Sequence, residues 1–203
     1  RIHGYDRIPV VLPAGSARVV VSDANIVPAN DLRRQMAARD WQEAINYAFV
    51  DAAWLTKWQL QGGVALANRL SAELGVMRPL LPGLTAALAR NVARQQPRVR
   101  LFEVGRVFAP PMQAGEAPIE TPRIAAIACG SARAEQWGEP DRAVDFHDAK
   151  GAVESLAAMA NAALEFRRSA GPFGDPGRSA DIYRLNEAGA GERIGWVGQL
   201  HPA

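Results

Sequence analysis

The feature that most limits how this chain can fold is a long alternation of apolar and polar residues, "RVRLFEVGRVF" at 98–108. A period of two places Phe102 and Val104 on one face and predicts a half-buried β-strand. A Pro/Gly-rich segment at 109–122 has no core-forming pattern, and a second apolar run, "RIAAIACG", follows it at 123–130. Two strands separated by such a loop predict an antiparallel hairpin.

The rest of the chain divides into shorter alternating and helical patterns. Further strands are predicted at 16–23, 43–51, 164–169, 179–185 and 193–202. Helical periods predict helices over 31–40 with Asn30 or Asp31 as N-cap, over 52–60 with Asp51 as the cap, in a segment with Pro82 in the first turn, and over 148–162. These patterns together predict an α+β fold, a mostly antiparallel sheet with three or four helices packed on it.

Composition narrows the class of protein. With 203 residues, 48% of them hydrophobic and 22% charged, the chain suits one soluble globular domain. A net charge of +2 is too small to argue for nucleic acid, and the single cysteine, Cys129, excludes an internal disulfide and a cysteine-built zinc site. No apolar run approaches the ~20 residues of a membrane span, and the opening "RIHGYD" suggests a piece of a longer protein without a signal peptide. A cytoplasmic location, with no membrane partner, is the expectation.

The glycine-rich stretch "GAGERIGW" at 189–196 has two readings, a phosphate-binding loop or a hairpin turn. A phosphate-binding loop presents its N–H groups by leading into a helix N-terminus. Here the stretch lies between two alternating runs, and Asn186 with the glycines suits positive φ. The pattern therefore predicts a hairpin turn.

A local cluster of arginines accompanies the first long strand: Arg90, Arg94, Arg98 and Arg100. Cations at the end of a helix suit its dipole and reach its last carbonyls. A contact with RNA phosphates or with an acidic partner is the alternative reading.

Seven stretches in a fixed order carry a resemblance that covers essentially the whole chain. They are "RIHGYDRIP" (1–9), "INYAFVD" (45–51), "LANRLSAELGVMRPLLPGLTAALARN" (66–91), "RLFEVGRVF" (100–108), "WGEPDRAVDFHDAKGAVESL" (137–156), "PGRSADIY" (176–183) and "ERIGWVGQLHP" (192–202). In this order they resemble the β chain of bacterial phenylalanyl-tRNA synthetase. By that resemblance, residues 1–15 are the end of a preceding B5 domain with a connector, and 16–203 form a synthetase-like core.

The resemblance implies a class II aminoacyl-tRNA synthetase-like antiparallel sheet flanked by helices, without catalytic, cofactor-binding or metal-binding residues of its own. The catalytic chain would be the α chain of an (αβ)₂ heterotetramer that acts on tRNA(Phe), with ATP and Mg²⁺ used by the holoenzyme only. This segment would dock the α chain and organise the heterotetramer. Editing and anticodon-binding domains of that family are absent from these residues.

Two sets of residues follow from the resemblance. In class II enzymes a long helix followed by a strand builds the subunit interface, and residues 31–50 occupy that place. The interface candidates are Leu32, Met36, Trp41, Tyr47 and Phe49. The strand at 98–108 has the shape of the second class II motif, whose polar residues would be Arg100, Glu103 and Arg106.

Two alternatives to a docking core remain open. The motif-like strand and the letters "GAGER" would suit a ligase domain that binds ATP by itself, although a hairpin turn offers no helix N-terminus to a phosphate. A contact of Glu103 and Arg106 with a partner or with solvent is preferred to ATP contact. The other alternative is a tRNA-contacting surface formed by Arg90, Arg94 and Arg98.

Overall fold

The structure is a computed structural model. It describes residues 9, 11, 15, 26–59, 63–66, 75–77, 80–113, 115–169, 171 and 174–201. The strand predicted at 16–23 lies outside these residues, as does most of the stretch 1–15 that precedes the predicted domain boundary.

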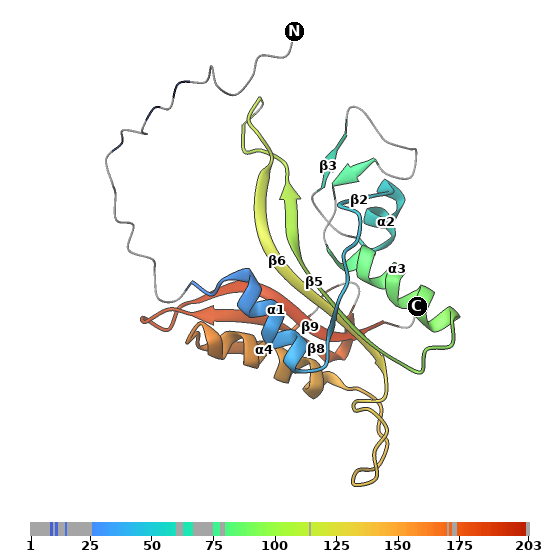
Figure 1. The fold of residues 1–203 in the computed structure, drawn as a ribbon. Helices are drawn as coiled ribbons and strands as arrows, with labels where there is room; N and C mark the ends of the chain where they lie inside the picture. The colour runs from blue at the N-terminus through green and yellow to red at the C-terminus, as the bar shows by residue number, and fades with distance from the viewer. Residues whose placement is uncertain are drawn as a thin grey trace.

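The described residues form helices and small sheets in an α+β arrangement (Figure 1). The helices are α1 (Ala29–Ala38), α2 (Ala52–Lys57), α3 (Leu80–Ala93) and α4 (Phe146–Met159). The strands are β1 (Gln42–Glu43), β2 (Phe49–Val50), β3 (Val64–Ala65), β4 (Val76–Met77), β5 (Arg98–Ala109), β6 (Ile119–Gly130), β7 (Leu164–Arg168), β8 (Gly174–Leu185) and β9 (Gly191–Leu200). None of these helices is long and apolar enough to span a membrane.

The predicted central hairpin is confirmed. β5 and β6 pair antiparallel along their full length, from Arg98 opposite Gly130 to Ala109 opposite Ile119. β6 begins four residues earlier than predicted, because the apparent loop residues from Ile119 onward pair with β5 instead of looping out. The short strand β1 adds to the other edge of β5 in parallel.

The single sheet predicted from the sequence is divided. The described strands form three separate three-stranded sheets, in the orders β1-β5-β6, β2-β4-β3 and β7-β8-β9. Alternation predicts that a segment is a strand but not which edge it pairs with, so it does not distinguish one sheet from three. The first and last sheets still share apolar contacts, since Leu200 at the end of β9 packs against the core on one face of the hairpin.

The alternating segment 43–51 is not one half-buried strand, contrary to the prediction. β1 ends at Glu43, and β2 begins at Phe49. Between them Ile45 is 94% exposed and Tyr47 is 78% exposed. After the Ala44 N–H donates to the Phe102 carbonyl (2.7 Å), the chain leaves the edge of β5. Alternation predicts only that one face of a segment is apolar. No described element covers Ile45 and Tyr47 on that face.

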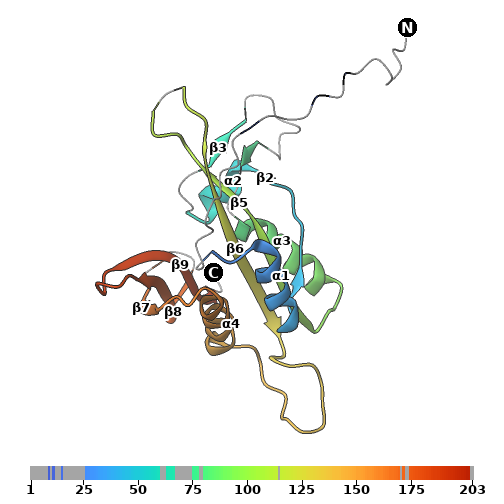
Figure 2. The same ribbon diagram turned by 60° about the vertical axis from the view of Figure 1, so that its left-hand side comes forward.

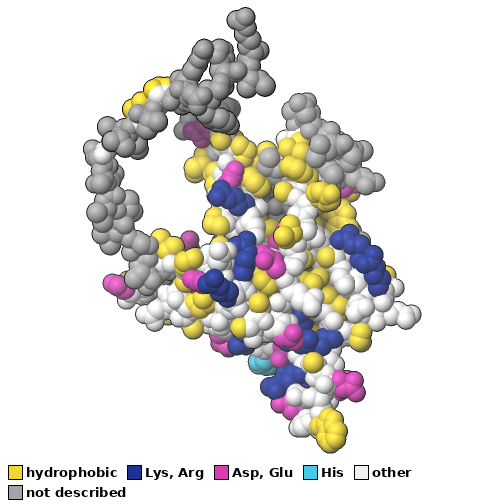
Figure 3. Space-filling model, in the orientation of Figure 1, with side chains coloured by type: hydrophobic (Ala, Val, Ile, Leu, Met, Phe, Trp, Pro, Cys, Tyr) yellow, Lys and Arg dark blue, Asp and Glu magenta, His cyan; other side chains and the backbone are white. Residues whose placement is uncertain are grey.

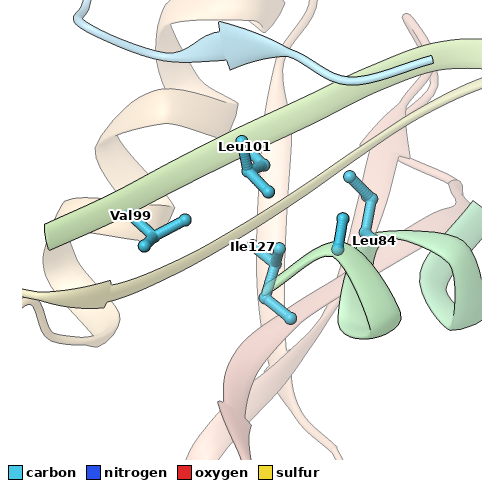
Figure 4. Close-up of a cluster of buried hydrophobic side chains, with 5 residues drawn as sticks. Leu84, Val99, Leu101 and Ile127 are labelled. Atoms are coloured by element: carbon cyan, nitrogen blue, oxygen red, sulfur yellow. The ribbon is translucent and has the colours of Figure 1, made fainter. Parts of the chain in front are cut away.

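The two faces of the β5–β6 hairpin bury different cores. On one face α3 packs Leu84 and Ala87 against Val99, Leu101 and Ile127, as Figure 4 shows for the four labelled residues. On the other face the core consists of Met36, Trp41, Phe102 and Ala152, from α1, the turn after it, β5 and α4. Figure 1 shows α1 and α3 on opposite sides of the hairpin.

Helix α4 connects this second core to the C-terminal sheet. Its residues Ala149 and Val153 pack against the buried Ala180, Ile182 and Val197 of β8 and β9. Leu156, one turn further on, packs against the core that contains Phe102. One helix therefore covers parts of two sheets that share no backbone hydrogen bonds.

The helix starts differ from prediction in two cases. α1 begins at Ala29 with Pro28 at the N-cap and no side-chain cap, so neither Asn30 nor Asp31 caps it. α4 begins at Phe146 rather than at residue 148. Pro28 has the extended backbone that an N-cap residue needs (φ −60°, ψ 143°) but no side-chain acceptor. The predicted cap of α2 is confirmed: the Asp51 carboxylate accepts from the Ala53 N–H at 3.0 Å.

Candidate functional site

The three polar residues of the motif-like strand do not converge on one site. Side chains along a β-strand alternate between its faces, so Arg100 and Arg106 share one face of β5 and Glu103 lies on the other. Glu103 therefore shares its face with Leu101, beside α3, while Arg100 shares its face with Phe102. A ligand on one face of β5 therefore cannot contact the Arg100 and Glu103 side chains at once.

Arg100 stabilises the base of the hairpin. Its guanidinium stacks over the Trp41 ring at 4.5 Å from the ring centroid, and its Nη1 donates to the Ala132 carbonyl at 2.9 Å. Burial, followed by the neighbouring charge of Arg98, lowers the pKa of Arg100. These contacts use the guanidinium within the chain and connect the helix–strand junction at Trp41 to the residues after β6.

Glu103 is the only buried charged residue in the described part of the chain, with 7% of its surface exposed. Its carboxylate accepts from the Asn46 side chain at 2.9 Å and from the Asn46 N–H at 3.4 Å. A buried carboxylate needs such partners. Glu103 thereby holds the segment that leaves β1, the same segment that carries the exposed Ile45 and Tyr47.

Arg106 is exposed and forms an ion pair with Glu120 on β6. The pair joins neighbouring positions across the hairpin, where solvent screens it. In the described residues no three His, Cys, Asp or Glu side chains come together as a metal site would require. Arg100, Glu103 and Arg106 are thus all engaged in contacts within the chain.

The stretch "GAGERIGW" forms the predicted turn. The Asn186 N–H donates to the Ala190 carbonyl (3.0 Å), and the Ala190 N–H donates to the Asn186 side-chain oxygen (2.8 Å). Gly189 has φ of 77°, which favours glycine, and strand β9 rather than a helix begins at Gly191. The prediction of a hairpin is confirmed, and no helix N-terminus is available here to a phosphate.

Comparison with known proteins decides the family. The model of the family described as "Phenylalanyl tRNA synthetase beta chain CLM domain" matches residues 8–203. The chain belongs to this family. A relative called phenylalanine–tRNA ligase beta subunit, from Xanthomonas axonopodis pv. citri (strain 306), is 58% identical over 204 residues, which cover 100% of this chain and 25% of the relative. The protein of the same name from Xylella fastidiosa (strain Temecula1) is 54% identical over 205 residues, with the same coverage.

The chain spans about a quarter of the length of the curated relatives that it matches. The CLM-domain match covers both cores and all three sheets, so the internal contacts of β5 described above lie within the family's matched region.

The interface candidates of this CLM-family chain fall into three groups. Met36 and Trp41 are 1% and 5% exposed, so they are core residues that offer no surface to a partner. Leu32 and Phe49 are half-buried. Tyr47 is exposed, and Ile45, which the candidate set omitted, is more exposed still. We call these two residues the 45/47 face. The alternation of 43–51 contained the signal for Ile45, although alternation alone predicts a buried face.

The arginine cluster of this family member also divides. Arg98 forms an ion pair with Asp40 at 2.6 Å and donates to the Ser131 carbonyl at 3.2 Å, so it joins Arg100 in holding the hairpin base. Arg90 and Arg94 are exposed at the C-terminal end of α3. The four cations therefore do not form one patch, and only Arg90 and Arg94, at and just beyond the end of α3, are exposed.

A charged contact at the start of α4 was not predicted. The Asp145 carboxylate accepts from the His147 and Asp148 N–H groups, and the Asp148 carboxylate accepts from the Asp145 N–H, which makes a capping box. Asp148 also accepts from both Arg142 terminal nitrogens, at 2.6 and 2.7 Å. The Arg142 guanidinium lowers the pKa of Asp148 to about 2. The spacing of the two aspartates in "DFHD" contained a signal for the cap, but the partner arginine had none.

Proposed function

We propose that this chain is a non-catalytic core of the β subunit of phenylalanine–tRNA ligase, which attaches phenylalanine to tRNA(Phe) with ATP. In this proposal residues 16–203 form a class II synthetase-like core, preceded by the end of a B5 domain. The relatives support the assignment to the β subunit, because those named above are called phenylalanine–tRNA ligase beta subunits. The holoenzyme would use ATP and Mg²⁺ on its catalytic α chain.

The observation that carries the non-catalytic role is the division of polar residues on β5. Activation of an amino acid requires preorganised cations around the developing phosphate charge. In this chain Arg100 is engaged with Trp41 and Ala132, and Glu103 with Asn46 on the opposite face. An autonomous ATP-binding ligase would need the Arg100 guanidinium released from these contacts to meet the phosphate.

The 45/47 face is the docking surface that fits this role best. It follows α1 and the short strand β1, in the position where the family resemblance places the subunit interface. Exposed apolar side chains rimmed by polar residues mark interaction surfaces. The buried contact of Glu103 with Asn46 holds the residue between Ile45 and Tyr47, so the segment is positioned before a partner arrives. We infer that it contacts the α chain in the (αβ)₂ heterotetramer.

The test is a double variant of the full-length β chain, Ile45→Ala with Tyr47→Ala, mixed with its α chain. Removal of central apolar anchors weakens a protein interface by about tenfold or more. We expect loss of the mixed species in light scattering after size exclusion, together with loss of aminoacylation. Met112→Ala is the matched control, because Met112 is 88% exposed on a different loop. Unchanged assembly of the double variant contradicts the proposal.

A second role, contact with tRNA, is favoured by the exposure of Arg90 and Arg94 one turn apart on the last part of α3 and just beyond it. We expect Arg90→Gln with Arg94→Gln to weaken tRNA binding of the assembled ligase. The slope of log affinity against log salt should become shallower by roughly two, one for each phosphate that the variant no longer neutralises. An unchanged affinity and slope exclude the contact.

A further inference from the structure

The connection between β6 and α4, residues 131–145, projects from the body of the molecule, at the bottom of Figure 1 and of Figure 2. We call this connection the arm. Trp137 lies near its middle and is fully exposed, with a relative surface of 107%. The end of this projection in Figure 3 carries hydrophobic atoms beside charged ones. An indole ring exposed over its whole surface contributes nothing to a core of this chain.

The arm is held in shape at its base. The Ala132 N–H donates to the Arg142 carbonyl and the Val144 N–H to the Gly130 carbonyl, both at 2.9 Å. From β5, Arg98 and Arg100 donate to carbonyls of residues 131 and 132. The two sides of the arm therefore pair at its base through one antiparallel bridge, Ser131 opposite Ala143.

Charged contacts also close the arm nearer its end. Arg133 forms an ion pair with Glu139 on the two sides of Trp137, and the Ser131 hydroxyl contacts Asp141. Exposed pairs of this kind add little stability, but they bring the two sides of the turn together. The result is a positioned tryptophan at the end of a closed loop.

The charge of the arm indicates what it fits. It contains four carboxylates and two arginines, which leave a net charge of −2. Arg133 and Arg142 both pair with carboxylates, so the arm offers little positive charge to a phosphate. Tryptophan can stack on a nucleobase, but nucleic-acid surfaces of that type surround the aromatic ring with cations. An acidic arm with an aromatic end instead complements a protein pocket that has a cationic rim.

We propose that the arm is a protein interaction site, at which Trp137 inserts into an apolar pocket of a second polypeptide whose rim carries lysine or arginine. The site is separate in sequence and chemistry from the 45/47 face and does not rest on the proposed docking of the α chain through that face.

The test uses the assembled ligase with a photoreactive benzoylphenylalanine in place of Trp137 in the full-length β chain. A matched control carries the same group in place of Met112, which is 88% exposed on the loop between β5 and β6. We expect the group at 137 to crosslink to another polypeptide, at a peptide that contains apolar residues and lysine or arginine. A crosslink to tRNA, a crosslink within the same chain, or a yield no higher than the control at 112 overturns the proposal.

A second measurement compares Trp137→Ala with Trp137→Phe in binding to the crosslinked polypeptide. Loss of a hot-spot tryptophan should weaken binding by about tenfold or more, and phenylalanine should restore part of it. Binding should also weaken with salt, because the pocket's rim is cationic. Equal binding of both variants and the parent overturns the proposal, even if the Ile45→Ala, Tyr47→Ala variant fails to bind the α chain.

Discussion

The role of a single side chain in this protein depends on residues that are far from it in the sequence. Arg98 and Arg100 belong to one arginine-rich stretch with Arg90 and Arg94, yet the structure uses the first two to hold carbonyls after β6 and leaves the other two in solvent. The guanidinium of Arg100 lies between Trp41 and Ala132, which are 59 and 32 residues away along the chain. No pattern around residue 100 indicates either partner.

The ion pair of Asp148 with Arg142 predicts that Asp148→Asn lowers the free energy of unfolding in a pH-dependent way. The pKa of Asp148 is lowered from 3.8 to about 2 in the folded chain. Such a group stabilises the fold above its unfolded pKa, and the stability is lost as pH falls through the folded pKa. Because the Arg142 side chain is 53% exposed, solvent screens the contact, and we expect a loss of roughly 1 kcal/mol at pH 7.

Chemical denaturation of the parent and Asp148→Asn between pH 2 and pH 7 measures this effect. The free-energy difference between the two should be largest at neutral pH and should shrink below about pH 4, toward pH 2, as the carboxylate becomes protonated. Glu154→Gln is a control, because its contact with Lys150 is an ordinary exposed pair within one helix. A difference that is independent of pH would contradict the assigned cause.

At the scale of elements, the strands with both long alternation and a clear turn were predicted well. β5, β6, β8 and β9 overlap the predicted strands, although β8 begins at Gly174 rather than at residue 179 and β9 at Gly191 rather than at residue 193. The turn between β8 and β9 follows from Asn186 and Gly189. Element ends were less predictable. α1 starts without a polar cap, and the end of β6 nearest the loop extends into residues that composition alone assigned to the loop.

Helix α3 depends on one fully buried side chain for its packing on the hairpin. Leu84 is 0% exposed and contacts the core that contains Leu101 and Ile127 (Figure 4). Leu84→Ala should reduce the free energy of unfolding by about 2–5 kcal/mol, since it removes buried methyl groups and leaves a cavity. Denaturant titration of this chain measures the loss.

Val92→Ala supplies the comparison on the same helix. Val92 is 51% exposed, so its truncation should change the free energy of unfolding by no more than about 0.5 kcal/mol. If the two variants lost equal stability, α3 would not be held to the sheet through the face that carries Leu84.

At the scale of the whole molecule, the arrangement depends on elements shared between units. α4 packs on β8 and β9 through Val153 and toward Phe102 through Leu156, and Leu200 of β9 reaches the core beneath α3. These contacts join the first and last sheets without a backbone hydrogen bond between them. The proposed docking surfaces, the 45/47 face and the arm, both lie on connections that leave these shared cores.

The sequence by itself determined the α+β class, the long hairpin, the turn at 186–190 and the order of motifs that identifies the family. These depend on periodicity and turn chemistry, which act between residues close along the chain. Only the tertiary structure decided that the strands form three sheets, that Met36 and Trp41 are core while Ile45 and Tyr47 are exposed, and that Arg100 and Glu103 face apart. Burial depends on which distant element covers a face, and an apolar side chain has the same local pattern whether that cover comes from its own chain or from a partner.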